Sequence, residues 1–190
     1  MLSSLLLPLI LVLSGGVLFA QTGTNSAGSI GAGVSVAGAG ANGVLTKDAA
    51  GALMPPSVFF RGKTAPVQAR NAGGVRFDGD RLILAALVDT SGYSTRVQER
   101  YQAYFITETT LLIDGHRLPP GAYGVGFVAG DHFAVMDLGG HDVFVAGSHT
   151  DAELRRPMPL QVVAGKAEGQ FRLYVGRSYI DFSRAADESR

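Results

Sequence analysis

The chain has 190 residues, with 16 basic and 16 acidic side chains, so its formal net charge is zero. A balanced charge provides no field that would attract nucleic acid, which argues against a nucleic-acid-binding protein. The chain contains no cysteine, which excludes disulfides, thiolate metal sites and cysteine nucleophiles.

The first 46 residues contain no charged side chain. Residues 5–13 are apolar apart from Pro8, and Ala20 offers a cleavage site, so residues 1–20 have the pattern of a secretory signal peptide. An uncleaved anchor is the alternative, but the apolar stretch is shorter than the ~20 residues that span a bilayer. We therefore expect export to the bacterial periplasm or outside the cell, with membrane contact only through this segment.

Composition divides the rest of the chain into three parts. Residues 21–54 are rich in Gly, Ala and Ser, and such a segment buries too little apolar surface to offset the entropy of ordering it. We predict a disordered linker there, a β-domain over residues 55–183 and a disordered tail over residues 184–190.

Short strands are predicted at the start of the domain. Residues 66–70 and 75–77 are expected to be extended, separated by a turn at 71–74. Residues 82–88 are continuously apolar rather than alternating, which indicates burial on both faces and predicts a central strand.

One short helix is predicted near residues 96–103. Thr95 and Gln98 have the spacing of a capping box, and apolar side chains follow at helical spacing. The alternative is that the next strand extends back to Val97.

The clearest strand and turn signals lie between residues 104 and 121. A run rich in β-branched and aromatic residues over 104–113 ends at Asp114-Gly115, a pair suited to the type I′ turn that joins two hairpin strands. Residues 111–113 should therefore pair with 116–118. Pro119-Pro120-Gly121 predicts a second turn, with its glycine in the left-handed region.

The next strand is predicted to have two unlike faces. Tyr123, Val125 and Phe127 alternate with Ala122, Gly124 and Gly126. The first set is expected to pack in a core, and the second to allow another part of the chain to approach closely.

This region resembles a known arrangement. Leu111 to Tyr123, with its Leu-Pro-x-Gly-x-Tyr sequence at 118–123, is similar to a strand-and-turn region of several families of secreted bacterial β-sandwich domains, many of unknown function. The resemblance covers a small part of the chain. It implies a fold class and transfers no catalytic residue.

Further strands are expected at 132–138, 141–146, 159–164, 170–175 and 178–182. A Gly139-Gly140 turn would place Asp137 opposite Asp142 and Val135 opposite Phe144. Many short strands with regularly spaced turns predict an all-β antiparallel sandwich, or alternatively a small barrel.

The densest group of metal-ligand side chains lies in this hairpin. Asp131, His132, Asp137, His141 and Asp142 fall within twelve residues. His132 and His141 should lie at opposite ends of the hairpin, so only Asp137, His141 and Asp142 remain as candidate ligands of a divalent cation. Otherwise no cofactor is expected, and carboxylates at a strand end are commonly just solvated.

Tyrosines are the candidates for a ligand surface, because a phenol combines an apolar ring with a polar tip. Tyr104, Tyr123 and Tyr174 are the candidates, with core packing as their more common role.

Three functions are open from the sequence. The first is a non-enzymatic exported module that binds a protein partner or small ligand. The second is a metal-dependent or acid/base hydrolase using Asp137, His141 and Asp142. The third is a lipid-binding barrel with Tyr123, Val125 and Phe127 inside.

Overall fold

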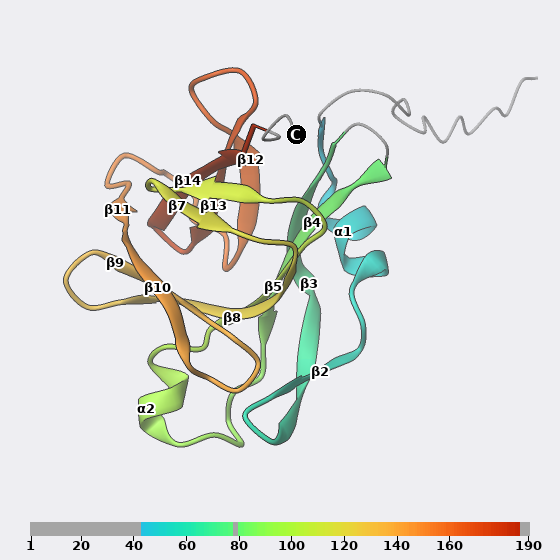
Figure 1. The fold of residues 1–190 in the computed structure, drawn as a ribbon, viewed down its shortest axis with the longest axis vertical. Helices are drawn as coiled ribbons and strands as arrows, with labels where there is room; N and C mark the ends of the chain where they lie inside the picture. The colour runs from blue at the N-terminus through green and yellow to red at the C-terminus, as the bar shows by residue number, and fades with distance from the viewer. Residues whose placement is uncertain (1–42, 78–79, 187–190) are drawn as a thin grey trace, which may run out of the picture. The chain divides into compact units, whose positions relative to one another are not determined.

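The protein is built from two antiparallel β-sheets and two short helices, as the computed structural model shows for residues 43–77 and 80–186 (Figure 1). The large sheet contains β1 (Gly43–Val44), β2 (Ser57–Phe60), β3 (Lys63–Arg76), β4 (Leu82–Val88), β5 (Ala103–Thr107), β8 (Gly121–Val128), β9 (His132–Met136) and β10 (Asp142–Gly147). The small sheet contains β6 (Leu111–Ile113), β7 (His116–Leu118), β11 (His149–Thr150), β12 (Gln161–Ala164), β13 (Gln170–Val175) and β14 (Ser178–Arg184). The helices are α1 (Lys47–Leu53) and α2 (Thr95–Gln98).

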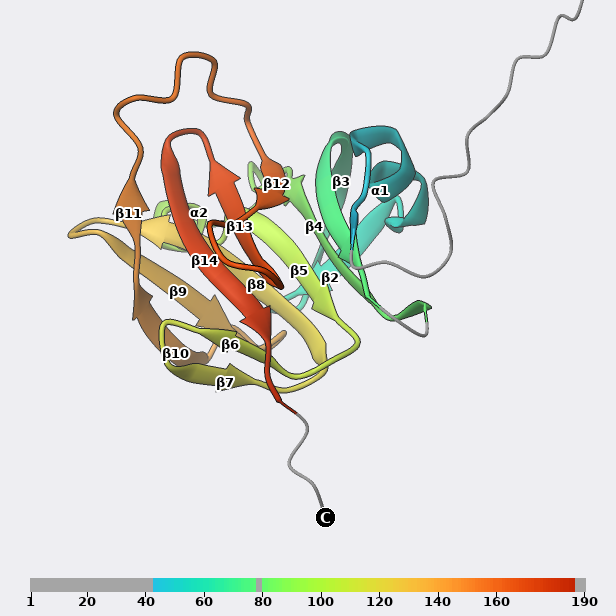
Figure 2. The ribbon, with the colours of Figure 1, turned by 90° about the horizontal axis from the view of Figure 1, so that it is seen from above.

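The strand order makes this a sandwich. The large sheet runs β1-β3-β4-β5-β8-β9-β10, with β2 also paired to β3, and the small sheet runs β12-β13-β14-β6-β7, with β11 also paired to β14. The two sheets face each other in Figure 2, and the first and last strands of each path are not paired to close a barrel. The predicted antiparallel sandwich is confirmed, and the barrel alternative is wrong.

The core between the sheets is filled by side chains from both. Phe105, Val125 and Phe133 come from the large sheet, and Leu173 and Phe182 from the small one, all nearly inaccessible to solvent. Tyr123 and Phe127 belong to the same cluster, so the predicted packing face of the 121–128 strand is confirmed.

A second apolar cluster lies on the other face of the large sheet. Phe60, Tyr93 and Tyr101, together with Ala50 of α1, cover that face. The predicted central strand is confirmed because β4 lies between β3 and β5 and is buried on both sides: Ile83 faces the inter-sheet core and Leu84 faces the outer cluster.

The side-chain-free face of β8 lies against this outer cover. A Cβ at Gly124 would come within 2.4 Å of the Phe60 ring, and a Cβ at Gly126 would come within 2.2 Å of the Arg100 carbonyl oxygen. The close approach predicted for this face is therefore confirmed, and the glycines leave the space that the cover occupies.

The predicted β6–β7 hairpin is confirmed, but the turn after it differs from the prediction. Leu111 pairs with Leu118, and Asp114 and Gly115 have φ of 45° and 78°, as a type I′ turn requires. Gly121 is not among the glycines in the left-handed region and begins β8 instead. The predicted left-handed glycine is therefore wrong.

The extended run predicted over 104–113 is divided between the sheets. β5 pairs with β4 and β8 in the large sheet, whereas β6 pairs with β7 and β14 in the small one. Thr107 and Thr109 are buried where the chain crosses, and the Thr107 hydroxyl donates to the Thr109 carbonyl oxygen at 2.6 Å. This local bond satisfies polar groups that the sheets leave unpaired at the crossing.

The predicted turn at 71–74 is wrong because those residues belong to β3. The pairing of β3 with β4 shifts register between Val67 and Ala72, which is a bulge in the strand. A Cβ at Gly73 would come within 2.9 Å of the Val162 backbone nitrogen, so the glycine lets β12 of the other sheet approach.

The boundaries of the ordered part also differ. Residues 43–54, predicted to belong to the linker, form β1 and α1, and Ala50 is fully buried against the large sheet. At the other end, β14 continues to Arg184, and the Ala185 amide donates to the Thr110 carbonyl oxygen. The predicted signal peptide, most of the linker and the end of the tail lie outside the described residues.

The predicted helix is present but shorter and starts earlier. α2 spans only Thr95–Gln98, with Ser94 rather than Thr95 in the N-cap conformation. The Gln98 side chain donates to the Tyr93 carbonyl oxygen at 2.7 Å, so the expected capping box does not form.

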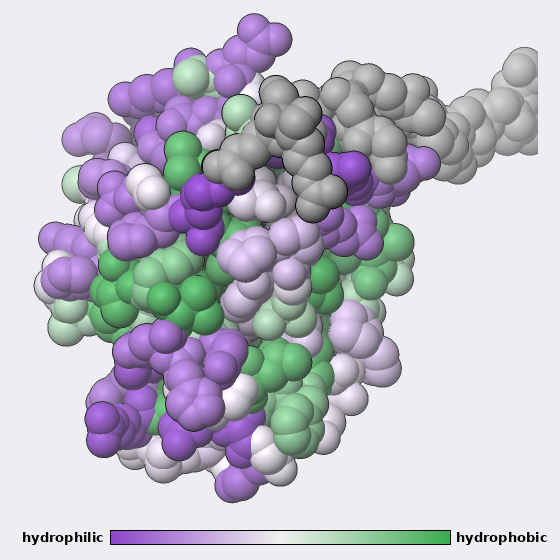
Figure 3. All heavy atoms as spheres, in the orientation of Figure 1, coloured by the Kyte–Doolittle hydropathy of each residue, from purple (hydrophilic) through white to green (hydrophobic). Residues whose placement is uncertain are grey.

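β10 forms an edge of the large sheet and carries exposed apolar side chains. Val143 and Val145 are each 42% exposed, and Figure 3 shows apolar side chains at the surface in this region. A register shift between Asp142 and Phe144 interrupts the pairing with β9. Such a bulge limits the addition of another strand to an open edge.

Candidate functional site

The β9–β10 loop holds the predicted metal ligands in an arrangement different from the expected one. Val135 pairs with Phe144 as predicted, but Asp142 pairs with Met136 rather than with Asp137. The register prediction is wrong at this end because the loop contains more than the two glycines. The Asp137 amide donates to the His141 carbonyl oxygen, which closes a loop from Asp137 to His141.

The structure brings together only two of the three candidate ligands. Asp137 accepts hydrogen bonds from the His141 amide at 2.9 Å and contacts the His141 ring Nδ1 at 3.1 Å. The bond from the His141 amide is the main cause that lowers the pKa of Asp137. Asp142 is instead paired with Arg100, Nη2 to Oδ1, at 2.6 Å.

The other members of the group lie elsewhere. His132 pairs with Gly147 and Val128, at the opposite end of the hairpin from His141, as predicted. Within residues 43–77 and 80–186, no three His, Asp or Glu side chains are grouped so as to hold a metal ion.

The three candidate tyrosines do not form one surface. Tyr123 lies in the inter-sheet core and its hydroxyl donates to the Pro119 carbonyl oxygen, whereas Tyr104 lies in the outer cluster. Tyr174 is on β13, where its hydroxyl donates to Asp151 at 3.1 Å. Each is less than a tenth exposed, and burial raises the pKa of all three phenols.

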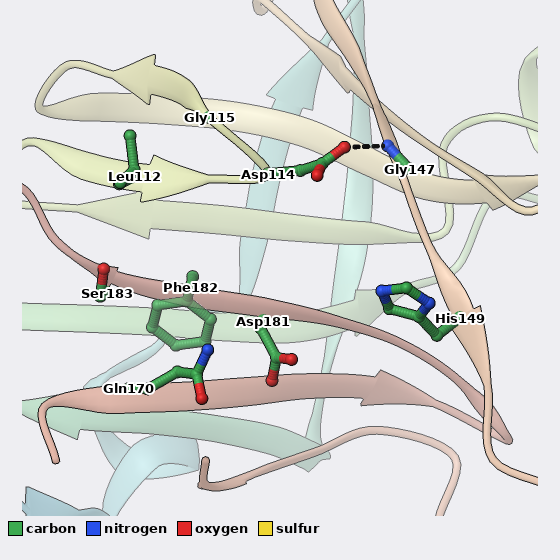
Figure 4. A pocket seen from close by; sticks show the side chains of 9 residues that line it. All are labelled: Leu112, Asp114, Gly115, Gly147, His149, Gln170, Asp181, Phe182 and Ser183. Atoms are coloured by element: carbon green, nitrogen blue, oxygen red, sulfur yellow. Dashed lines mark hydrogen bonds between the residues drawn. The ribbon is translucent and has the colours of Figure 1, made fainter. Parts of the chain in front are cut away.

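A groove of about 260 Å³ lies beside the small sheet, and we call it the small-sheet groove (Figure 4). It lies along β14, between β11, which pairs with Ser178 and Tyr179, and β6, which pairs with residues 182–184. Its lining consists of Leu112, Asp114, Gly115, Gly147, His149, Gln170, Asp181, Phe182 and Ser183.

Two carboxylates of the groove are held in place by the protein. Asp114 accepts a hydrogen bond from the Gly147 amide at 2.7 Å, which ties the β6–β7 turn to the end of β10. Asp181 pairs with Arg172, Nε to Oδ1, at 2.7 Å, and this hydrogen bond is the main cause that raises the pKa of Arg172. Both carboxylates are thus oriented before a ligand arrives.

Aromatic rings lie beside the groove. The Arg172 guanidinium lies over the Tyr179 ring at 4.3 Å, and the His149 and Tyr174 rings are 5.3 Å and 5.0 Å from that ring. Figure 4 shows His149 extending toward the groove from the strand opposite Asp181.

Ser148, His149 and Asp151 are close in sequence and have the residue types of a catalytic triad. The three are not joined in the structure: His149 contacts Tyr179, Asp151 accepts from Tyr174, and the Ser148 amide donates to the Asp131 carbonyl oxygen. A usable signal was the alternation on β14, where Tyr179, Asp181 and Ser183 alternate with the buried Ile180 and Phe182.

Comparison of the chain with protein-family models, curated proteins and solved structures finds no match. In the part of the chain that the structure describes, neither helix has the length and apolar character needed to cross a membrane.

Proposed function

We propose that this protein is an exported, non-enzymatic β-sandwich module, and that it binds a saccharide in the small-sheet groove. Export is supported by the pattern of residues 1–20 alone. The binding role is supported by one observation above all, which is that side chains from separate segments present fixed hydrogen-bond acceptors to a single groove.

The lining of the groove favours a ligand that donates hydrogen bonds. A carboxylate has about four lone-pair sites, and a single intramolecular bond to Asp114 leaves most of them for a ligand. Ser183 and Gln170 add a hydroxyl and an amide, which both accept and donate. Since the protein already orients its carboxylates, less conformational entropy is lost when a ligand binds.

The charge of the groove favours a neutral ligand over a polyamine. Two carboxylates line the groove in the described part of the chain. The charge of Asp181 is compensated by Arg172, whereas Asp114 has no cationic partner there. The His149 ring, which lines the groove, offers apolar surface next to these acceptors. Hydroxyl donors combined with an apolar C–H face are characteristic of a sugar ring.

Isothermal titration calorimetry with maltotriose and chitotriose tests the proposal. Asp114→Asn keeps an acceptor for the Gly147 amide and a residue type that tolerates positive φ, but removes the charge. We expect about a tenfold loss of affinity, because hydrogen bonds to charged groups contribute about 1.5–3 kcal/mol and a tenfold change corresponds to about 1.4 kcal/mol.

Asp131→Asn is the matched control, since Asp131 is also an exposed aspartate with positive φ, at 55°, and does not line the groove. Absence of heat with every oligosaccharide, or an equal loss of affinity in both variants, would contradict the proposal.

A further inference from the structure

A second cleft lies at one end of the large sheet, on the face away from the small sheet, and we call it the arginine cleft. It has a volume of about 380 Å³, within the range of about 300–1,000 Å³ usual for small-molecule sites. Three segments form it: the tip of the β2–β3 hairpin, α2 with the turn after it, and the β9–β10 loop. Its lining consists of Phe60, Arg61, Ser94, Arg96, Val97, Arg100, Met136 and Gly140.

Backbone contacts hold Arg61 at one wall of the cleft. Its φ is 49°, and its amide donates to the Leu138 carbonyl oxygen at 2.8 Å, which fixes the hairpin tip against the β9–β10 loop. The stem of its side chain lies over Gly140, where a Cβ would come within 2.3 Å of the Arg61 Cδ. The glycine therefore provides the space in which this arginine lies.

Contacts of a different kind hold Arg100. Its guanidinium pairs with Asp142, and its carbonyl oxygen lies against Gly126 of β8. Arg96 lies in α2, four residues before Arg100, and both side chains line the cleft. The guanidinium groups thus come from two separate segments that tertiary structure brings to one cleft.

Positive charge accumulates in this cleft although the whole chain is neutral. Among the described residues, the three guanidinium groups and the one carboxylate paired with them, that of Asp142, leave a formal charge of +2. Within the described residues, neither Arg61 nor Arg96 forms an ion pair. Lys63, which follows the tip of the β2–β3 hairpin, donates to the Gly92 carbonyl oxygen.

Apart from the polar Ser94, the rest of the lining consists of three apolar side chains and Gly140. Phe60 and Met136 are buried, and the Phe60 ring is stacked on Tyr101 with centroids 3.9 Å apart. A rigid apolar wall beside guanidinium groups suits a ligand with an anionic end and a hydrocarbon body. Guanidinium is a planar fork of donors that matches the oxygens of a carboxylate or phosphate.

We propose that the arginine cleft binds a small organic anion, with a phosphate or carboxylate group at Arg61, Arg96 and Arg100 and an apolar body against Phe60, Val97 and Met136. This site is separate from the small-sheet groove and does not depend on the function proposed for it.

Calorimetric titration of the purified protein with hexyl phosphate tests the proposal. Inorganic phosphate and hexanol, which carry only the anionic group and only the hydrocarbon chain of hexyl phosphate, are titrated for comparison. We expect hexyl phosphate to bind more tightly than either half, and the affinity to fall as salt is raised because the charges lie near the surface. Arg61→Gln and Arg96→Gln should each weaken binding about tenfold, the effect expected for removing a charge-assisted hydrogen bond.

Arg155→Gln is the matched control, because it removes an exposed arginine from a loop that does not line the cleft. Asp142→Asn, which leaves Arg100 without its carboxylate, should strengthen the binding of hexyl phosphate. Thermal unfolding of each variant shows whether the fold is retained.

Vesicles containing phosphatidylglycerol distinguish the two sources of such an anion. Competition between these vesicles and hexyl phosphate would identify a lipid head group, whereas hexyl phosphate binding without competition would identify a soluble ligand. Lack of binding to both, or equal binding by Arg61→Gln, Arg96→Gln and Arg155→Gln, would overturn the proposal.

Discussion

The two sheets differ in how many of their faces are covered. The large sheet packs against the small sheet on one face, and its other face is covered by α1, the Phe60 side chain and the segment around Tyr93 and Tyr101. The small sheet packs on its inner face, while some of its outer side chains, such as Leu112, are exposed. Neighbouring residues on β4, in the middle of the large sheet, such as Ile83 and Leu84, are therefore both buried, whereas on β6 of the small sheet the exposed Leu112 lies between the buried Leu111 and Ile113.

Because of this difference, the middle of the large sheet contributes mainly to stability, whereas the small sheet has side chains available to line a groove. Each strand in the middle of the large sheet contributes apolar side chains to two clusters, so the sheet has little free surface there. The small sheet needs only one face for the core, which leaves side chains of β14 such as Asp181 and Ser183 to line a groove. The arginine cleft follows the same rule, since it lies at the end of the large sheet where the outer cover meets a loop.

The largest expected effect is on the free energy of unfolding, when neighbouring residues are replaced by alanine on one strand of each sheet. Ile83→Ala and Leu84→Ala, on opposite faces of β4, should each lower the free energy of unfolding by about 2–5 kcal/mol, because both side chains are buried. On β6, Leu111→Ala should cost a similar amount, whereas Leu112→Ala, at a position 39% exposed, should cost about 0.5 kcal/mol or less. Urea unfolding measures all four.

A small cost for Leu84→Ala would show that the outer cluster contributes little to stability. A large cost for Leu112→Ala would show that the outer face of the small sheet is covered in solution. Either result would remove the distinction between the two sheets.

The next effect concerns how closely the outer cover packs. Gly126→Ala would place a methyl group within 2.2 Å of the Arg100 carbonyl oxygen, so the segment after α2 must shift. We expect a loss of about 1–3 kcal/mol, the usual cost of overpacking, measured by thermal unfolding.

Gly92→Ala is the control for Gly126→Ala, since nothing lies within 4 Å of a Cβ there and its φ is not in the left-handed region. We expect it to leave stability unchanged or raise it by up to about 1 kcal/mol, because alanine restricts the unfolded chain. Equal stability of the two variants would mean that the cover is displaced from β8 in solution.

The sequence predicted features that depend on local chemistry and missed those that depend on distant parts of the chain. The strand at 82–88 and the Asp114-Gly115 turn are specified by their own residues, and both were predicted correctly. The glycines at 71–74 look like a turn, yet Gly73 is there because β12 approaches it. Local composition cannot reveal such a neighbour.

The candidate sites were harder to predict for the same reason. Polar alternation on β14 indicated an exposed face, but the groove also requires β6 and β11 to flank that strand, and strand order is a long-range property. Arg61 and Arg96 are far apart in sequence and lie at the same cleft only because the β2–β3 hairpin covers the large sheet next to α2. In the β9–β10 loop, a one-residue error in register was enough to place Asp142 beside Asp137 rather than beside Arg100.

Two phenols of the outer cover are expected to differ in their contribution to stability. The Tyr93 hydroxyl donates to the Phe60 carbonyl oxygen at 2.9 Å, whereas the buried Tyr101 hydroxyl has no hydrogen-bond partner among the described residues. Tyr93→Phe should therefore lower the free energy of unfolding by about 1 kcal/mol, and Tyr101→Phe should raise it by about the same amount. A loss of stability in Tyr101→Phe, measured by urea unfolding, would mean that this hydroxyl is hydrogen-bonded in solution.

The smallest effect concerns Asp137, which is partly exposed in the β9–β10 loop at the edge of the large sheet. Hydrogen bonds from the His141 amide and then from its ring hold the pKa of Asp137 below the ordinary value of 3.8. A lowered pKa in the folded state favours folding above the unfolded-state pKa, and that contribution is lost as pH falls through the lower, folded-state value. Carbon-detected NMR titration of the Asp137 carboxyl should give a midpoint below 3.8. In His141→Ala the midpoint should rise only part of the way, because the amide bond remains, whereas a full return to the ordinary value would assign the shift to the imidazole.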